Sequence, residues 1–155
     1  MNIAATLVQA LKLKGAIVAL AESCTGGGIA SAITAIEGSS ACFDRGFVTY
    51  SNAAKMQMLG VSEETLAAYG AVSGQTAEAM ALGALEHSLA DISLSVTGIA
   101  GPGGATADKP VGTVWFGLAK RDHVVQSHLE CLKGGRNQVR AAAVDFALRW
   151  ILSVL

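Results

Sequence analysis

The chain has 155 residues, of which 52% are hydrophobic and 15% are charged, and its formal net charge is −1 at pH 7. This balance excludes a disordered or fibrous chain, and it provides no basic field for nucleic acid. No apolar run approaches the ~20 residues that cross a membrane. A chain of this length buries roughly two-thirds of its unfolded surface, so we expect one α/β domain over residues 1–155.

Three cysteines and three histidines limit the chemistry. Cys24, Cys42 and Cys131 are odd in number and contain no CxxC pair, which favours a reducing cytoplasm over a disulfide framework. The histidines are scattered, so neither set supplies the clustered ligands of a metal site. Residues 1–15 form an amphipathic pattern without the features of a signal peptide. We therefore expect a cytoplasmic protein without a metal.

Hydrophobic spacing predicts helices and strands along the first part of the chain. Apolar residues from Ile3 to Leu11 recur at helical spacing, and Gly15 is a stop signal. The next predicted elements are a strand at 17–21, a helix at 29–36, a strand at 43–50 and helices at 52–58, 63–69 and 75–89. The last of these helices has one apolar face, formed by Ala77, Met80, Ala81, Ala84 and Leu85.

The second part of the chain is predicted to be rich in strands. A strand at 92–97 opens into a glycine-rich loop, and residues 114–119 are apolar enough for a strand buried on both faces. Residues 125–131 alternate, which predicts a strand with one covered face formed by Val125, Ser127, Leu129 and Cys131. The short link at 120–123 predicts an antiparallel hairpin. A final helix has an inner side formed by Val139, Ala142, Ala143, Phe146, Trp150 and Ile151.

The order of these elements predicts a three-layer α/β/α sandwich around a mixed, mostly parallel sheet. The earlier strands are separated by helices, and such crossovers join parallel strands. In an open α/β sheet, ligands bind where strands end and helices begin. Three segments of unusual composition fall at such places.

The first segment, at 21–28, places Ser23 at a strand end before three glycines. Glycines let the backbone approach a ligand closely, and free N–H groups at the next helix start could hold a phosphate or a developing oxyanion. Ser23 or Thr25 could instead only cap the helix. Cys24 could be a competing nucleophile or a small buried thiol.

The second segment follows the strand at 43–50. Asn52 is the expected N-cap of the next helix, which puts Lys55 in the first turn. A cation is disfavoured there, so the pKa of Lys55 should be lowered, as a general base requires. The alternative is an ordinary solvated lysine. Tyr50 is either a packing aromatic or a hydroxyl donor that lines the site.

The third segment carries Thr97, Gly98 and further glycines up to Gly104. It matches neither GxxxxGK[ST] nor GxGxxG, and it could be only a structural turn. Near the C-terminus, Arg136 follows two glycines at the start of the last helix, where it could bind phosphate or be a surface arginine. No histidine lies near a predicted strand end, so a Ser–Lys pair is the only base arrangement of a known type that the sequence offers.

Together these segments resemble the C-terminal domain of the CinA family. Several motifs match in order over nearly the whole chain: AESCTGG at 21–27, GSSACFDRGFVTYSNAAK at 38–55, LGV at 59–61, GAVS at 70–73, SVTGIAGPGG at 95–104 and KPVGTVWFGLA at 109–119. The family's fold is similar to the predicted mixed-sheet sandwich. The separate N-terminal domain of long family members has no room in 155 residues.

The resemblance implies an amidohydrolase that converts nicotinamide mononucleotide and water to nicotinic acid mononucleotide and ammonia, in pyridine nucleotide (NAD) recycling. It implies that Ser23 is the nucleophile and Lys55 its base, with Tyr50 beside them. We expect the substrate to be bound by Thr25, Gly26, Gly27, Thr97, Gly98 and Arg136. The implied reaction needs no cofactor and no metal, and the sequence leaves the oligomeric state, including a homo-oligomer, open.

Three other functions compete with this one. A non-catalytic nucleotide-binding or regulatory module of the same family would keep the glycine loops without a competent Ser–Lys pair. A nucleotide pyrophosphatase would need clustered carboxylates for a metal ion, whereas Glu22 is the only acidic residue in the three segments. A cysteine amidase would use Cys24 and would lose its activity on Cys24→Ala.

Overall fold

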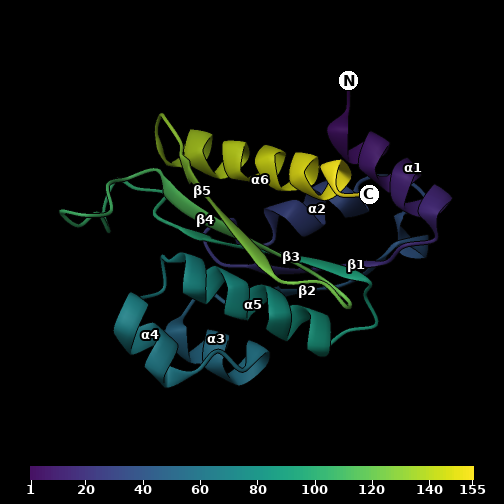
Figure 1. Cartoon of the computed structure of the whole chain (residues 1–155). Coiled ribbons are helices and arrows are strands. Elements are labelled where there is room, and N and C mark those ends of the chain that lie inside the picture. Colours follow the sequence, from purple (N-terminus) through teal and green to yellow (C-terminus); the bar gives the residue numbers. More distant parts are fainter.

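The computed structural model describes residues 1–155 and confirms the three-layer sandwich (Figure 1). Its central sheet contains β1 (Val18–Glu22), β2 (Phe43–Val48), β3 (Ile92–Gly98), β4 (Thr113–Lys120) and β5 (Gln126–Cys131). One face of the sheet is covered by α1 (Ile3–Lys14), α2 (Gly28–Thr34) and α6 (Arg136–Ser153). The opposite face is covered by α3 (Asn52–Leu59), α4 (Glu63–Tyr69) and α5 (Gly74–Glu86). A 3₁₀ turn, η1 (Ser39–Ala41), precedes β2.

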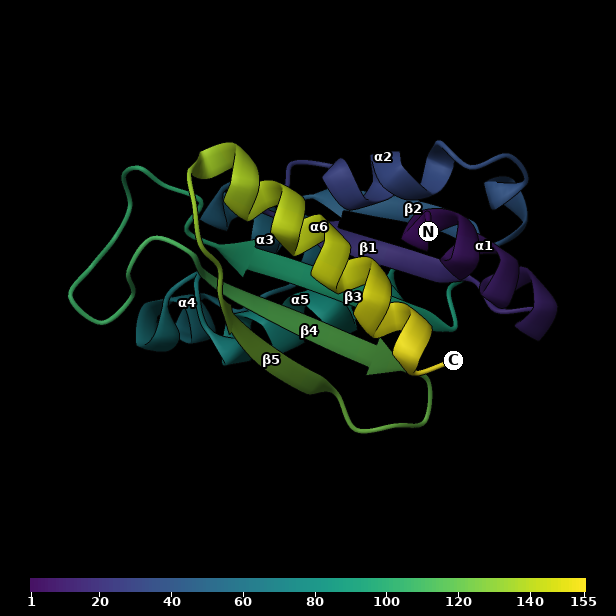
Figure 2. The same ribbon diagram turned by 90° about the horizontal axis from the view of Figure 1, so that it is seen from above.

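The strands lie in the order β2-β1-β3-β4-β5 (Figure 2). β1 pairs in parallel with β2 and β3, and β4 pairs antiparallel with β3 and β5. Only β4 therefore runs against the other strands, because residues 99–112 lead from β3 to β4 without a crossover helix. This arrangement confirms the mixed, mostly parallel sheet and the final antiparallel hairpin. The carboxyl ends of β1, β2 and β3 meet at one edge, where the three segments of unusual composition lie.

The two helical layers pack against the sheet through buried side chains. On the side of α1, α2 and α6, a core of large apolar residues includes Leu7, Leu20, Ile33, Phe116 and Ile151. On the other side α5 lies close to the sheet, because Gly117 leaves room for the backbone of Ala77. Two buried hydroxyls of β3 donate to α5 carbonyls there. The predicted apolar face of the 75–89 helix is buried throughout, as expected.

β5 corrects one prediction. Leu129, expected on a covered face, is 40% exposed, and Cys131 is exposed as well. Val125 and Ser127 of that face are half-buried as predicted, and the Ser127 hydroxyl donates to Glu78 of α5 at 2.9 Å. From the opposite face, the ring of His128 stacks on Phe146 of α6 with centroids 4.9 Å apart. β5 is an edge strand, and α6 crosses over β1, β3 and β4 instead (Figure 2). Alternation therefore predicted the strand and the covered part of this face at Val125 and Ser127, but not the exposure of Leu129 and Cys131.

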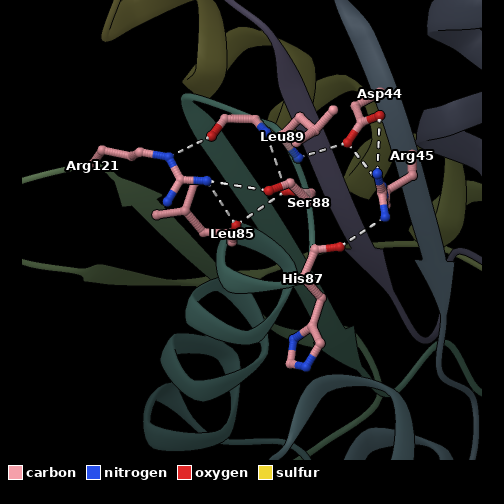
Figure 3. A network of polar contacts seen from close by, with 8 residues as sticks. Asp44, Arg45, Leu85, His87, Ser88, Leu89 and Arg121 are labelled. Atoms are coloured by element: carbon pink, nitrogen blue, oxygen red, sulfur yellow. Dashed lines mark hydrogen bonds and ion pairs between the residues drawn. The ribbon is translucent and has the colours of Figure 1, made fainter.

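A polar network fixes the connection from α5 to β3, residues 85–90 (Figure 3). Arg121, just after β4, donates to three carbonyls of this connection, those of Leu85, Ser88 and Ala90. From β2, the Asp44 carboxylate accepts from the Leu89 N–H at 2.9 Å, and Arg45 donates to the His87 carbonyl at 3.0 Å. A cation that satisfies the last carbonyls of a helix is favourable. None of the six helices combines the length and apolar character needed to cross a bilayer.

Candidate active site

Ser23 lies immediately beyond β1, at the edge where the strands end. Its N–H donates to the Val96 carbonyl at 3.0 Å, which continues the pairing of β1 with β3. Its own carbonyl accepts from the Gly26 N–H at 3.0 Å and closes a tight turn. Gly26 and Gly27 have φ of 58° and 97°, a region that favours glycine. The glycines after the serine therefore serve this turn.

Glu22 occupies the start of α2 and corrects another prediction. Its carboxylate is 1% exposed and accepts from the N–H groups of Ile29 and Ala30 at 3.0 and 2.9 Å, and from the Thr25 hydroxyl. A buried carboxylate is stabilised by the positive end of a helix and by these donors. The expectation that this helix start holds a substrate anion was wrong, because the chain supplies its own anion.

Lys55 is brought to Ser23 by the corner between β2 and α3. The helix is capped by Ser51, not by Asn52 as predicted, since the Ser51 hydroxyl accepts from the Ala54 N–H at 3.0 Å. Lys55 is then the fourth residue of α3, so its place in the first turn is confirmed. Its Nζ lies 3.0 Å from Ser23 Oγ.

The surroundings of Lys55 suit an uncharged amine. The residue is 1% exposed, and burial lowers its pKa against a smaller opposing effect of Cys24. Nζ also contacts the carbonyl oxygens of Thr49 at 2.8 Å and Tyr50 at 3.4 Å. A neutral amine has two N–H donors and one lone pair. In that neutral form the two carbonyls take the donors and the lone pair is left for the hydroxyl proton of Ser23, whereas the ammonium form donates to all three oxygens.

The surroundings of Cys24 favour its protonated thiol over the thiolate. Burial raises the pKa of its thiol to about 11, and the charge of Glu22 adds to this effect. The thiolate is the nucleophilic form of cysteine, and it is scarce at neutral pH when the pKa is this high. The structure therefore favours Ser23 over Cys24 as the reactive side chain.

A cavity of about 240 Å³ opens at this edge of the sheet. Its lining brings together six of the predicted site residues: Ser23, Tyr50, Lys55, Thr97, Gly98 and Arg136. The remaining three, Thr25, Gly26 and Gly27, do not line it. Thr25 is turned toward Glu22 instead. No carboxylate and no histidine lines the cavity, and its basic groups are Lys55 and Arg136.

The walls of the cavity include residues that sequence reasoning missed. Ala71 and Val72 line it from the segment before α5, and the Thr97 hydroxyl donates to the Ala71 carbonyl at 2.8 Å. This hydrogen bond fixes the 70–73 segment to the end of β3. Asn52 lines the cavity as well. The signal for the 70–73 segment was the GAVS stretch, which matched the family without an assigned role.

Arg136 spans the mouth of the cavity. It is the first residue of α6, as predicted, and its guanidinium donates to the Gly101 carbonyl at 2.7 Å and to the Tyr50 hydroxyl at 3.3 Å. Tyr50 is 64% exposed, so it belongs to the rim of the cavity. Residues 99–112, which include Gly101, extend outward beyond the sheet (Figures 1 and 2).

Arg140, one turn further along α6, contacts the turn that follows Ser23. Its Nε donates to the Cys24 carbonyl at 3.1 Å and its Nη2 to the Thr25 carbonyl at 3.3 Å. Sequence reasoning missed this residue. The available signal was its spacing of four from Arg136, which places both arginines on one side of a helix. No group of three or more His, Cys, Asp or Glu side chains gathers anywhere in the structure.

Known proteins resemble this chain over its whole length. A model of the CinA C-terminal domain matches residues 1–155. The nicotinamide-nucleotide amidohydrolase PncC of Enterobacter agglomerans is 59% identical over 92% of this chain and 87% of its own length. PncC of Escherichia coli K12 is 53% identical over 96% and 90%, respectively. The crystal structure of the competence/damage inducible protein CihA from Agrobacterium tumefaciens has a TM-score of 0.94 at 49% identity, covering 97% of this chain and 92% of that one.

Another relative is much longer than this chain. A CinA-like protein of Geobacter sp. strain M21 is 50% identical over 96% of this chain, which covers only 36% of that protein.

Proposed function

This chain belongs to the CinA C-terminal domain family, and on that basis we propose that it is an amidohydrolase that converts nicotinamide mononucleotide and water to nicotinic acid mononucleotide and ammonia. The two relatives named nicotinamide-nucleotide amidohydrolase support this substrate. The observation that carries the proposal is the 3.0 Å contact between Ser23 Oγ and the buried Nζ of Lys55, within a cavity.

The chemistry begins with Lys55 as an uncharged base. Nζ accepts the hydroxyl proton of Ser23 while Oγ attacks the carboxamide carbon and the carbonyl oxygen becomes an oxyanion. When the tetrahedral intermediate collapses, the C–N bond breaks, and Nζ returns the proton to the departing nitrogen as ammonia leaves. Water then attacks the acyl-enzyme, Nζ takes a proton from the water, and Ser23 recovers that proton as the carboxylate product is released.

The lining suggests how the substrate lies. The carboxamide must reach Ser23 Oγ, and Arg136 at the mouth offers a guanidinium that can hold a phosphate with two hydrogen bonds. The cavity volume of about 240 Å³ is below the ~300–1,000 Å³ of typical ligand pockets. We therefore place the pyridine ring inside the cavity and the phosphate at its open mouth. Thr97 and Gly98 form the wall beside the ring.

We also propose the setting of the reaction. The product is a pyridine nucleotide that can re-enter NAD synthesis, so the enzyme would recycle the mononucleotide that NAD-consuming reactions release. All three cysteines are free thiols, two of them buried, which is consistent with the reducing cytoplasm.

Ammonia release tests the proposal. Purified protein is given nicotinamide mononucleotide, and ammonia and nicotinic acid mononucleotide are quantified together, with Ser23→Ala as the control. We expect the two products in equal amounts from the wild type and neither from the variant. Binding of the mononucleotide without product would instead support a regulatory module and would refute the enzymatic proposal.

A further inference from the structure

We infer that Arg140 is a positioning residue, which holds the turn at 23–27 so that the backbone N–H of Cys24, which lines the cavity beside Ser23, faces the oxyanion of the reaction. The inference deepens the proposed function and rests on it. Arg140 is half-buried and does not line the cavity, so it acts on the reaction through the backbone rather than by touching the substrate.

The first step is the direction of the peptide units. A trans peptide is planar, and its C=O and N–H point in opposite directions. Because Arg140 Nε holds the Cys24 carbonyl at 3.1 Å, it also sets the direction of the Thr25 N–H, which points away from α6. The guanidinium therefore fixes one donor of the turn directly.

The second step extends this control to the neighbouring unit. Arg140 Nη2 holds the Thr25 carbonyl at 3.3 Å. The N–H of that same peptide unit belongs to Gly26 and donates to the Ser23 carbonyl at 3.0 Å. The Ser23 carbonyl shares its plane with the Cys24 N–H. One guanidinium thus orients three consecutive peptide units, beginning at the nucleophile.

The third step is that the Cys24 N–H is not used in a backbone hydrogen bond. In residues 23–28, the N–H groups of Ser23, Gly26 and Gly28 donate to protein carbonyls. Those of Cys24, Thr25 and Gly27 donate to no carbonyl of the protein. Buried N–H groups are rarely left unpaired. Cys24 lines the cavity beside Ser23, and the N–H after a serine nucleophile is a recurrent oxyanion donor in hydrolases.

The geometry requires an arginine rather than a lysine. The planar guanidinium presents several N–H donors in a rigid fork, so it can hold two carbonyls at a fixed separation. An ammonium on a flexible stem can bind one carbonyl but does not define the plane between two. Arg140→Lys should therefore keep the charge and the helix while it releases the turn.

The experiment compares Arg140→Lys and Arg140→Ala with the matched control Arg149→Ala, which removes an exposed arginine from the same helix. kcat and KM are measured for nicotinamide mononucleotide and for its thiocarboxamide analogue. Loss of one oxyanion donor lowers kcat by ~10²–10³, so we expect at least a tenfold fall in kcat for both Arg140 variants, and KM should change less than about threefold. The preference for oxygen over sulfur should shrink, because sulfur is the weaker acceptor. Arg149→Ala should match the wild type.

The outcomes separate the two proposals. If the wild type is active and Arg140→Lys shows an unchanged kcat and an unchanged ratio of the rates for carboxamide and thiocarboxamide, the role of Arg140 is overturned while the proposed function stands. A lowered melting temperature with an unchanged ratio would also overturn it, since a purely structural tether has that effect. A wild type that releases no ammonia would overturn the proposed function and, with it, this inference. If Arg140→Ala does not fold, Arg140→Lys decides.

Discussion

Replacing Lys55 with arginine should remove the base while keeping a cation in the same place. A positioned general base contributes about 10²–10⁴ to the rate, which corresponds to about 3–5 kcal/mol of transition-state stabilisation. We expect the upper part of this range, because no other titratable side chain within the cavity contacts Ser23 Oγ. The measurement is kcat/KM for nicotinamide mononucleotide in the wild type, Lys55→Arg and Lys55→Met.

The pH dependence gives the sharper test. Burial lowers the pKa of Lys55, and only the deprotonated amine accepts the Ser23 proton. The wild-type kcat/KM should therefore rise with pH until it passes this lowered pKa and then level off. Arginine stays protonated throughout, so Lys55→Arg should lose this rise. Near-normal activity with an unchanged profile in Lys55→Arg would mean that another group activates Ser23, and Tyr50 would be the next candidate.

The same ionisation should affect stability. An unfolded lysine holds its proton up to a pH of ~10.4, whereas folded Lys55 releases it at a lower pH. Between these two values unfolding takes up a proton, so the free energy of unfolding of the wild type should rise with pH relative to Lys55→Met. The lost hydrogen bonds to carbonyls are independent of pH and do not alter this trend. Denaturant titrations that run parallel for both proteins across that window would contradict the reasoning.

Three further predictions concern the nucleophile, the independence from metal and the carboxylate at the start of α2. Ser23→Ala should abolish deamidation without unfolding the protein, while Cys24→Ala should leave the activity nearly unchanged. If Ser23→Ala kept more than about a tenth of the wild-type kcat, a loss of under ~1.4 kcal/mol, Ser23 would not be the nucleophile. Exhaustive chelation should leave the rate unchanged, and a loss that a divalent ion restores would revive the pyrophosphatase alternative. Glu22→Gln should destabilise the protein by about 1–3 kcal/mol, measured by thermal unfolding, because an amide cannot accept from all three donors at the start of α2.

The pairing of Ser23 with Lys55 was predictable because both residues follow strands of one parallel sheet. Segments that follow such strands meet at one edge, whatever their separation in the chain. The spacing of apolar residues likewise predicted the helices and strands, and their order predicted the layers. These inferences depend on local periodicity and on a general rule of topology, both of which a single sequence contains.

The features that the sequence did not predict depend on which distant groups individual side chains contact. Glu22 accepts from amides seven and eight residues later, across a turn whose shape only the folded chain defines. Arg140 holds carbonyls more than 110 residues before it. Leu129 lies on the same face of β5 as Ser127, which packs beside Gly74 at the start of α5, so its exposure depends on where α5 begins, which alternation along β5 does not encode. Such long-range placements follow from packing rather than from sequence pattern.

The way in which Lys55 is held has a consequence for the evolution of the enzyme. Besides Ser23, the atoms that contact Nζ are main-chain oxygens, those of Thr49 and Tyr50. Every amino acid supplies a main-chain oxygen, so exchanging the side chains at these two positions leaves the cradle of the base in place. Tyr50 is 64% exposed, so its side chain can change toward new substrates, whereas the fully buried Thr49 is limited by packing. Insertions or deletions within 49–55, which would shift the main chain itself, should be the changes that selection removes.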